Sequence, residues 1–582
     1  MKTVLAMNKK IKGIFRSHWG IILILLSFLG SAVIVPIMVD VPISDDWIYA
    51  RSVEIFLSSG RLEILNISVA SLVFQVLWGS VFAKILGYSF GILRVSTFAL
   101  VLISGLYFYL LLEKFNIKKE LATLGTAIYL FNPLTYSLSF TFMTDMHFTS
   151  IMVIASYYYL VGIKNGIINI NTLFAAFLSG LLFLIRQMGV IFSLSILSYL
   201  ILVKEIRLSR DGLRKLIYTI GPTIVIIGGY YYWVVNIHGI PKWQTGYFDV
   251  LLQMDILSWV IFYLRFFPVA IIYLSIFILP LLIPMFLAIS TWQKGKLTKI
   301  TLFSVVLFML SWLLITLTGM RMPYLPHFLN RAGLGPNDLI VSIPTLMQAK
   351  YLIWPSLFLL ITSIVMIVFL INPYTIKKVQ KDNSLLMIFI ILLGQIVVAI
   401  PPSLVFRNFQ IDGYATPGLD RYLLPVIPLM IIFTINLLND EPINLRLSWI
   451  VLILVALFSI AGTRDLLVLH EKNWDLARKA NNLGIPNLLL DGGATWDGYN
   501  TYQPESDIGA TPRANFEEIQ VEEPNKHIIA TSLPWWFYVW APEIDPEYII
   551  SGAKIMNYLV LDTTEYYSWL RRDEVELYLL RR

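Results

Sequence analysis

Long apolar stretches separated by short polar breaks occupy most of the first 463 residues. Several of them reach the roughly 20 residues that a helix needs to cross the hydrocarbon core of a membrane. The length rule predicts about thirteen spans, near residues 20–40, 90–112, 119–137, 146–163, 171–185, 188–203, 214–236, 264–289, 300–319, 350–372, 384–401, 422–438 and 446–463. A shorter apolar piece near residues 65–85 is expected to lie at the membrane surface, within a first outer loop and juxtamembrane region at 41–88.

Basic residues in the loops predict the orientation of these spans. The positive-inside rule assigns four loops rich in Lys and Arg to the cytoplasm, namely 113–120, 204–215, 293–299 and 377–382. The alternate loops then face outward, namely 41–64, 237–256, 320–349 and 402–420. Because thirteen is odd, the two termini lie on opposite sides. We therefore expect a multi-pass protein of the plasma or inner membrane, with a cytoplasmic N-terminus and an extracytoplasmic C-terminus.

The composition changes after the last apolar stretch. Residues 464–582 are polar and acidic, are rich in Trp and Tyr, and contain no further span. Apolar segments alternate there with turn-forming and charged stretches, which favours a mixture of strands and helices. The predicted organisation is an all-α polytopic membrane domain over residues 1–463 and a small extracytoplasmic α/β domain over residues 464–582.

Composition narrows the possible classes of function. The chain is 57% hydrophobic and only 14% charged, far from the roughly 25% charged residues of soluble domains. Its formal net charge of +7 is spread over short loops instead of forming one basic face, so nucleic acid is not expected as a partner. The chain has no cysteine, which excludes disulfides, thiolate zinc sites and cysteine nucleophiles.

Acidic residues at the ends of two predicted spans are the main candidates for chemistry. Asp45 and Asp46 begin the first outer loop, and Asp145 opens the fourth span on the same side. Each could simply lie at a helix N-terminus, where a carboxylate is favourable. Ionisable residues at the lip of a span are costly in lipid, however, and tend to mark a site. Two acidic motifs on one face could converge on one cavity.

At these residues the sequence resembles the integral-membrane GT-C glycosyltransferases, particularly the protein O-mannosyltransferases and the lipid A aminoarabinose transferases. In that superfamily an acidic pair in the first outer loop precedes a juxtamembrane helix, a second span opens with an Arg, and a late span begins with Arg-Tyr-Leu-Leu-Pro. The segments 93–115, 144–148 (TDMHF) and 419–430 (LDRYLLPVIPLM) fit this pattern. The matching residues are Asp45, Asp46, Tyr49, Ala50, Ser59, Gly60, Arg94, Asp145, Arg421 and Tyr422. The residues expected to bind substrate are Tyr49, Arg94, His147, Arg186, Arg421 and Tyr422.

The resemblance implies an inverting transfer of a hexosyl or pentosyl group from a polyprenyl-phosphate donor to a protein, lipid or glycan acceptor. Such a transfer needs a carboxylate that deprotonates the acceptor hydroxyl and a cationic cradle for the phosphate. Asp45 or Asp46 would be the base, with Asp145 as the second acidic site. Arg186 and Arg421 are the candidates for the phosphate because a guanidinium binds it in fork geometry. Snorkelling to the interface is the alternative for Arg186, and pairing with Asp420 is the alternative for Arg421.

A divalent metal is possible but not favoured, and no other cofactor is expected. His147 lies two residues from Asp145, a spacing that could help to bind a cation. The oligosaccharyltransferase branch of the superfamily holds a metal in this region, but its hallmark Trp-Trp-Asp-Tyr-Gly is absent. The segment 534–540 (PWWFYVW) resembles that hallmark only superficially. Its aromatic side chains could stack on sugars, although packing within the C-terminal domain is favoured.

Three other classes remain open. A secondary transporter also has many spans and buried charges, but we find no paired halves, and the acidic residues lie at one surface. A lipid-linked glycan ligase would carry its key residues in a late outer loop. A receptor or scaffold fits if the acidic pair only starts a helix. Under the transferase hypothesis, the loops with Trp243, Tyr247, Tyr324 and His327 are expected to close over substrate.

Overall fold

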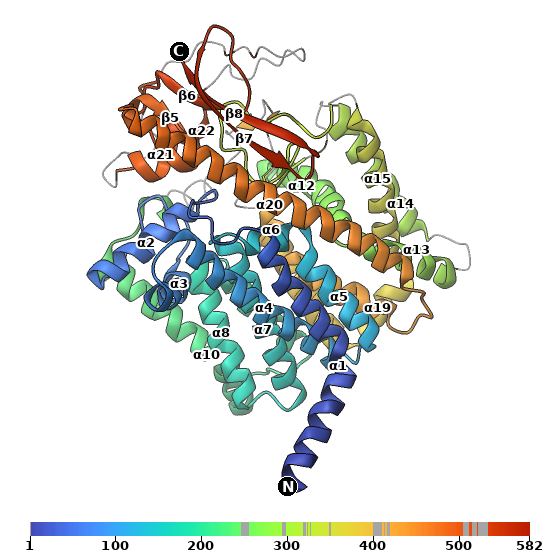
Figure 1. Ribbon diagram of the computed structural model, residues 1–582. Helices are drawn as coiled ribbons and strands as arrows, with labels where there is room; N and C mark the ends of the chain where they lie inside the picture. Colours follow the sequence, from blue (N-terminus) through green and yellow to red (C-terminus); the bar gives the residue numbers. More distant parts are fainter. Residues whose placement is uncertain are drawn as a thin grey trace.

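The computed structural model describes most of the chain. The described residues are 2–245, 255–293, 298–317, 322, 324–325, 327–348, 351–399, 410–411, 414–415, 419–503, 511–514, 519, 521 and 533–582. They form a mainly helical body with a small β-sheet near the C-terminus, as the sequence predicts (Figure 1). Tyr247, one of the loop residues expected to cover substrate, lies outside the described residues.

Apolar helices make this a multi-pass membrane protein. Among the described residues, six helices are long and apolar enough to cross a membrane, or up to eight if each of two bent pairs is one span. The six are α4 (Phe90–Lys114), α7 (Thr144–Lys164), α10 (Arg210–Trp233) with the π-helical turn η1 (Val234–His238), α14 (Lys299–Leu317), α15 (Ile353–Leu370) and α20 (Arg446–Asn482). The predicted total of thirteen spans is not confirmed.

Several predicted spans are shorter or broken helices. One bent pair is α12 (Ile256–Phe277) and α13 (Leu279–Gln293), which meet at 99°, and the other is α16 (Pro373–Lys381) and α17 (Asn383–Ala399), at 110°. The predicted span at 119–137 is interrupted by Pro133, which starts a new helix because proline suits the first helical position. Helix α1 (Lys2–Ile34) is kinked at His18, and its apolar part His18–Ile34 is short. The other short helices are α2 (Asp46–Ser59), α3 (Val73–Leu86), α5 (Lys119–Phe131), α6 (Pro133–Ser139), α8 (Ile170–Ile185), α9 (Gly189–Leu202) and α19 (Val426–Leu438).

The C-terminal sheet is attached to the end of a very long helix. Helix α20 continues for 37 residues, so the predicted domain boundary at 463/464 falls inside it. Asp465 of α20 accepts hydrogen bonds from Ser568 Oγ (2.7 Å), Trp569 N (2.9 Å) and Leu570 N (3.0 Å). These bonds fasten the turn between β7 (Leu559–Ser568) and β8 (Asp573–Arg581) to the helix, and Figure 1 shows the strands lying along the upper part of α20.

The sheet mixes parallel and antiparallel pairs. In the described part of the chain it has four strands in the order β5-β6-β8-β7, with β5 parallel to β6 and the other pairs antiparallel. The bounds are β5 (Leu490–Asp491), β6 (Tyr548–Ser551), β7 (Leu559–Ser568) and β8 (Asp573–Arg581), with the helices α21 (Ala494–Thr501) and α22 (Trp535–Val539) and the 3-10 turn η5 (Asn487–Leu489) beside them. The expected mixture of strands and helices is present.

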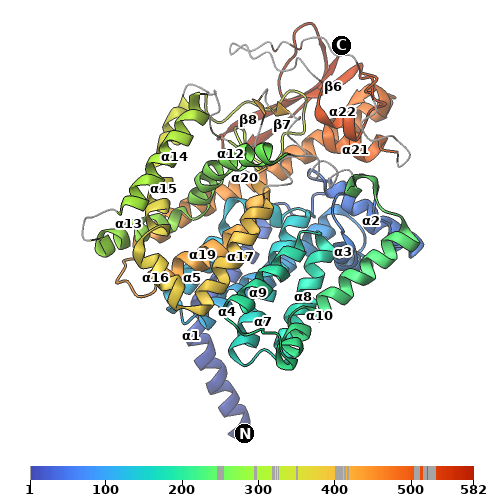
Figure 2. The same cartoon turned by 180° about the vertical axis from the view of Figure 1, so that it is seen from behind.

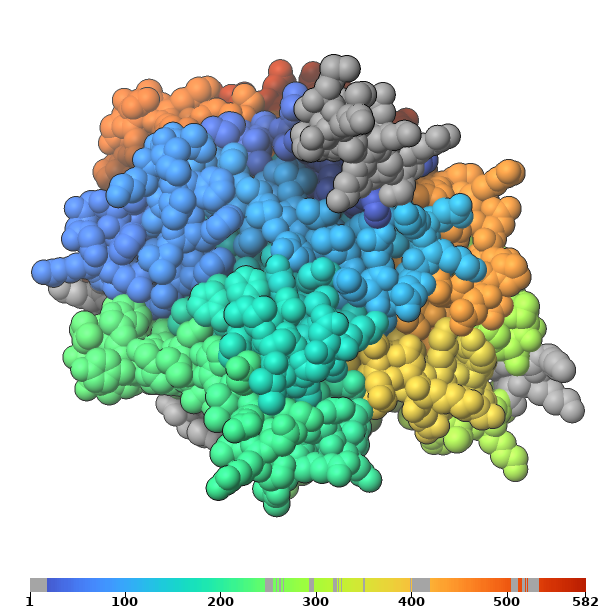
Figure 3. Space-filling view, turned by 90° about the horizontal axis from the view of Figure 1, so that it is seen from below, coloured from blue at the N-terminus to red at the C-terminus, as the bar shows by residue number. Residues whose placement is uncertain are grey.

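Loops on the side of the helical body away from the sheet are tied together. Lys118 N donates to Asn439 Oδ1 (2.8 Å), and Lys378 Nζ donates to Asp440 Oδ2 (2.8 Å). Trp292 Nε1 donates to Glu441 Oε1 at 2.6 Å. Residues of two of the basic loops predicted to be cytoplasmic, and Trp292 next to a third, thus contact the connection between α19 and α20, which lies away from the sheet, on the left in Figure 2 and on the right in Figure 3. That this side is cytoplasmic stays a prediction.

The loops on the sheet side are also tied together. Ile64 N donates to His238 Nε2 (2.9 Å), and Trp243 N donates to Asn66 O (3.1 Å). Gly552 N donates to Val341 O at 2.8 Å, which joins the loop after α14 to the C-terminal sheet. This region also contains the two-residue strands β1 (Leu329–Asn330), β2 (Gly333–Leu334), β3 (Gln410–Ile411) and β4 (Tyr414–Ala415), and the 3-10 turn η4 (Asp420–Leu423).

A buried carboxyl pair predicts how the stability of the C-terminal region depends on pH. Asp491 Oδ1 accepts from Gly493 N (3.0 Å), and Asp497 accepts from Gly492 N (2.9 Å) and Trp536 Nε1 (3.1 Å). Burial raises the pKa of Asp491 to about 6, and burial together with the Asp491 charge raises the pKa of Asp497 well above its usual range. Between pH about 4 and these higher values the folded state binds more protons than the unfolded state, so stability falls as pH rises.

We therefore expect the free energy of unfolding of the detergent-solubilised protein to be lower at pH 8 than at pH 5 by an amount on the order of 3 kcal/mol. The thermal unfolding midpoint, which measures this change, should be lower at pH 8. Asp491→Asn is the matched variant, since its amide oxygen still accepts from Gly493 N while its N–H₂ group donates to Asp497. The variant should flatten the dependence. An equally steep dependence in the variant would show that this pair is not its cause.

Candidate active site

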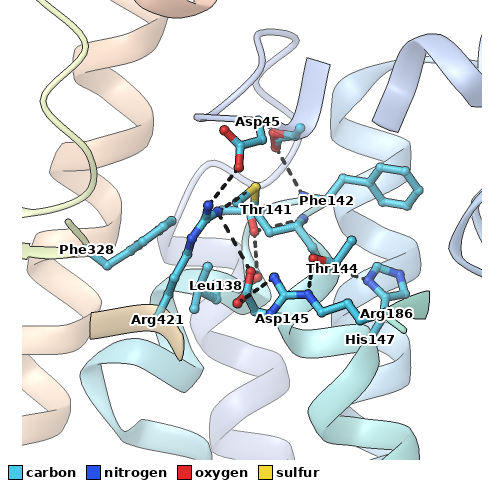
Figure 4. A network of polar contacts seen from close by, with 12 residues as sticks. Asp45, Leu138, Thr141, Phe142, Thr144, Asp145, His147, Arg186, Phe328 and Arg421 are labelled. Carbon is cyan, nitrogen blue, oxygen red and sulfur yellow. Dashed lines mark hydrogen bonds and ion pairs between the residues drawn. The ribbon is translucent and has the colours of Figure 1, made fainter. Parts of the chain in front are cut away.

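Two aspartates and two arginines form a chain of ion pairs at the sheet side of the membrane helices (Figure 4). Arg421 Nη2 lies 2.8 Å from Asp45 Oδ2, and Arg421 Nη1 lies 4.0 Å from Asp145 Oδ2. Arg186 Nη2 lies 2.9 Å from Asp145 Oδ1. The order Asp45, Arg421, Asp145, Arg186 alternates in sign, so the group carries no net charge when all four are ionised. We call these four residues the ion-pair chain.

Each member of the ion-pair chain lies at the end of a different helix. Asp45 immediately precedes α2, Asp145 is in the first turn of α7, Arg186 directly follows α8, and Arg421 lies in η4 before α19. Polar side chains at helix ends can reach a common point without crossing the apolar middle of a span. The contact between Asp45 and Arg421 joins residues 376 positions apart, so the fold brings together what the sequence separates.

The two acidic motifs do not act as helix caps. Neither Asp45, at the position before α2, nor Met143, before α7, makes a side-chain capping bond. Thr144 Oγ1 instead accepts a hydrogen bond of 2.7 Å from Arg186 Nε. Thr144 and Asp145 therefore hold the Arg186 guanidinium together in a forked contact. The contacts with Thr144 and Asp145 hold the Arg186 side chain inside the protein, which disfavours the alternative that it snorkels to the membrane interface.

Burial differs along the ion-pair chain. The Asp145 side chain is fully buried, the arginines are 6% (Arg421) and 13% (Arg186) exposed, and the Asp45 side chain is 19% exposed. Burial alone would lower the pKa of Arg421, but Asp45, Tyr422 and Asp145 together raise it well above its usual value. Arg421 is therefore a permanent cation. Asp45 is the carboxylate of the ion-pair chain that a substrate reaches most easily.

Two tyrosines border the ion-pair chain. The guanidinium carbons of Arg421 and Arg186 lie 5.4 Å and 5.8 Å from the centre of the Tyr422 ring, distances suited to a cation–π contact. Tyr49 is buried in α2, and burial followed by the charge of Asp45 raises its pKa above the usual value. Both hydroxyls therefore stay protonated. The structure thus places Tyr49 and Tyr422 beside the acidic residues with which the sequence motifs group them.

Asp46, although adjacent to Asp45, points away from the ion-pair chain. Its Oδ1 accepts from Ile43 N and its Oδ2 accepts from Phe142 N, both at 3.1 Å. Burial raises the pKa of Asp46 to about 6, and the charge of Arg94 acts in the opposite direction. The carboxylate joins the first outer loop to the segment before α7. Its predicted role as a base is therefore less favoured by the geometry than that of Asp45.

Asp46→Ala should lower the stability of the protein by at least about 2 kcal/mol, because two buried N–H groups lose their acceptor. Asp46→Asn keeps one acceptor oxygen and should cost less. Thermal unfolding midpoints measure both effects. In a transfer assay Asp46→Asn should retain activity within about tenfold, whereas a catalytic base would cost about a hundredfold or more. A loss of that larger size in well-folded Asp46→Asn would move the base from Asp45 to Asp46.

Arg94 and His147 also lie outside the ion-pair chain. The buried Arg94 guanidinium donates to the carbonyl oxygens of Val39 and Val41, and so fixes the chain that leads to Asp45. His147 Nδ1 lies 3.0 Å from Met143 O, and its ring packs on Phe142 with 5.4 Å between centroids. Their predicted contacts with substrate stay predictions. The observed contacts show that Arg94 holds the segment before Asp45 and that His147 packs against the segment before α7.

No group of three or more His, Asp or Glu side chains in the described part of the chain is arranged to hold a metal ion. His147 contributes no contact to the carboxylate of Asp145, which faces the two arginines. The expectation that a divalent metal is possible but not favoured stays a prediction.

Sequence reasoning missed the position of Asp420. It considered Asp420 only as a partner of Arg421, but the Asp420 carboxylate accepts from Phe328 N (3.1 Å) and Leu329 N (2.5 Å). Burial raises the pKa of Asp420 to about 7, against the effect of these hydrogen bonds. Asp420 thus fixes the loop after α14 beside Arg421. The Asp-Arg dipeptide at the start of a span was the available signal, but the sequence does not show which groups each side chain meets.

The C-terminal region covers the start of α2 with aromatic side chains. The ring of Trp47 lies 5.4 Å from that of Trp540 and 5.7 Å from that of Tyr502. Trp536, in the same aromatic segment, donates to Asp497. These contacts agree with packing as the main role of the Trp and Tyr clusters.

One of the loop residues expected to cover substrate, His327, packs on Phe328 with 5.1 Å between ring centroids, and Phe328 N donates to Asp420, next to Arg421. Burial, followed by the charge of Arg421, lowers the pKa of His327 well below its usual value. Tyr324 is buried, and the neighbouring Leu325 N donates to Tyr273 OH at 2.8 Å. Trp243 is bonded through its backbone to Asn66. Closure of these loops over substrate stays a prediction.

Comparisons with known proteins give remote structural matches. No protein-family model and no curated protein matches the chain. The crystal structure of ArnT from Cupriavidus metallidurans in the apo state shares 12% identity and a TM-score of 0.36, with 95% of this chain and 97% of ArnT covered. The crystal structure of ArnT from Cupriavidus metallidurans bound to undecaprenyl phosphate shares 12% identity and a TM-score of 0.36, with 96% of this chain and 97% of ArnT covered.

The AglB match covers less of its target. The archaeal oligosaccharyltransferase AglB from Archaeoglobus fulgidus, in complex with an inhibitory peptide and a dolichol-phosphate, shares 13% identity and a TM-score of 0.39. The match covers 81% of this chain and 60% of AglB.

Proposed function

We propose that this protein is a glycosyltransferase that moves a sugar from a polyprenyl-phosphate donor to an acceptor hydroxyl at the outer face of the membrane. The observation that carries the proposal is the ion-pair chain, in which two carboxylates and two arginines from four helix ends meet at one side of the membrane helices. A phosphate leaving group and a hydroxyl to be deprotonated need these two kinds of side chain side by side.

Asp45 is the general base in this proposal. It is the more exposed of the two carboxylates in the ion-pair chain, whereas Asp145 is fully buried and is held by Arg186. A general base must come within hydrogen-bond reach of the acceptor proton, which favours the side chain at the surface of the cluster. Asp145 then serves to orient the two arginines.

Arg421 and Arg186 receive the phosphate. Both guanidinium groups lie against the Tyr422 ring, so they occupy one small region where a single phosphate can reach both. A planar guanidinium offers paired donors to phosphate oxygens, and little exposure strengthens the interaction. Attack of the acceptor on the sugar carbon opposite the phosphate gives inversion. The lipid tail of the donor lies in the membrane beside the helices.

The test is transfer of radiolabelled sugar from polyprenyl-phosphate donors to a membrane extract by the purified protein. A panel of donors with different hexoses and pentoses identifies the sugar, and extraction of the product with organic solvent or protease digestion separates lipid from protein acceptors. Label in an acceptor fraction, dependent on the protein, supports the proposal. Absence of transfer from the whole panel contradicts it and favours a transporter or scaffold.

A further inference from the structure

The proposed base is already occupied in the structure described here. Asp45 Oδ2 lies 2.8 Å from Arg421 Nη2, so the carboxylate that should accept a proton is engaged by the guanidinium that should bind phosphate. An oxygen that already accepts a charge-assisted hydrogen bond from a guanidinium is not free to receive the acceptor proton. The resting site therefore withholds its base.

We propose that the donor phosphate and Asp45 compete for Arg421, so that donor binding displaces Asp45 and makes it available as the base. The inference rests on the proposed function and adds to it how the site is regulated. An acceptor or water that arrives first meets an engaged carboxylate. Donor binding must therefore precede deprotonation of the acceptor. Hydrolysis of a donor whose phosphate has not yet reached Arg421 is suppressed.

The contacts of the two arginines differ in a way that suits this exchange. Arg186 has two close partners, Asp145 at 2.9 Å and Thr144 at 2.7 Å, and both belong to the first turn of α7. Arg421 has one close carboxylate, Asp45, and a second at 4.0 Å, Asp145. Arg186 is thus fixed, whereas Arg421 keeps a neighbouring negative charge when Asp45 leaves it. Arg421 can therefore change partner without becoming an unpaired buried cation.

The charges balance through the reaction. The acceptor oxygen forms a bond to the anomeric carbon, the bond from that carbon to the phosphate oxygen breaks, and its electron pair stays with the phosphate. The acceptor proton passes to Asp45. Asp45 and the phosphate carry one negative charge each before transfer, and the phosphate carries both afterwards. Arg421 thus has an anionic partner throughout, and Asp45 must lose its proton before it can take Arg421 back from the spent carrier.

Affinity for undecaprenyl phosphate, the carrier without sugar, tests the competition. Binding to the purified protein in detergent is measured for the wild type and Asp45→Asn. We expect Asp45→Asn to bind the carrier at least about tenfold more tightly, as removal of a partly buried competing charge implies. Glu54→Gln is the matched control, because it removes the same charge from α2 at an exposed pair with Arg51, and its affinity should equal that of the wild type.

A second comparison separates exchange at Arg421 from general repulsion of the phosphate. In an Arg421→Gln background, adding Asp45→Asn should leave the weak residual affinity unchanged, and this double variant keeps the charge of the ion-pair chain at zero. Asp45→Ser serves as a second single variant and should also bind more tightly. Equal or weaker carrier binding by folded Asp45→Asn and Asp45→Ser, or tightening in the Arg421→Gln background, would overturn the exchange. Lack of carrier binding by the wild type would instead overturn the proposed function.

Discussion

Asp45→Asn should reduce sugar transfer by about a hundredfold or more, the usual size of the effect when a general base is removed. The asparagine amide keeps the shape of the side chain but cannot accept the acceptor proton. Because the same change frees Arg421 for phosphate, the loss should appear as a lower kcat and not as a higher KM for the donor. Initial rates over a range of donor concentrations measure both constants.

Glu54→Gln controls for the change in charge on α2 and should transfer at the wild-type rate. Matching gel-filtration profiles establish that each variant is folded. If folded Asp45→Asn transfers as fast as the wild type, Asp45 is not the base, and the ion-pair chain has a structural or transport role instead.

Arg421→Gln is expected to lower transfer by about a hundredfold to a thousandfold, which is the loss seen when one preorganised donor to a developing negative charge is removed. The side chain of Arg421 is only 6% exposed, so water replaces its contribution poorly. Arg421→Lys keeps the charge but loses the planar fork, and should be intermediate. Unlike Asp45→Asn, both variants should also weaken binding of undecaprenyl phosphate.

Arg51→Gln is the matched control for this second prediction, because Arg51 is a partly exposed arginine of α2 that pairs with Glu54 at 3.4 Å. It should leave transfer and carrier binding unchanged. Wild-type carrier affinity in folded Arg421→Gln would show that the phosphate binds elsewhere.

The sequence predicted the general architecture because apolar length and charge bias act locally. Membrane helices, the grouping of two basic loops on one side and a mixed C-terminal region follow from patterns within about 20 residues. The breaks in the helices were harder to predict. Pro133 lies inside a continuous apolar run and divides it into α5 and α6. The 99° bend between α12 and α13 also falls within one apolar stretch. Hydropathy measures length in residues, but it does not register a change of direction.

The candidate site was predictable in its members but not in their pairing. Asp45 and Asp46 are equivalent as sequence, but Asp45 meets Arg421 from another part of the chain, whereas Asp46 accepts two backbone N–H groups. Successive residues at a helix start project in different directions, so only the fold can separate their roles. Arg94 shows the same limit, since its guanidinium meets the carbonyl oxygens of Val39 and Val41 instead of a substrate.

The unbroken course of α20 fixes the position of the C-terminal sheet relative to the membrane. A helix of 37 residues is about 55 Å long at 1.5 Å per residue, well beyond the roughly 30 Å hydrocarbon core. The sheet is attached to this helix through Asp465, so the rigid helix, and not a flexible linker, sets the height of the sheet above the lipid.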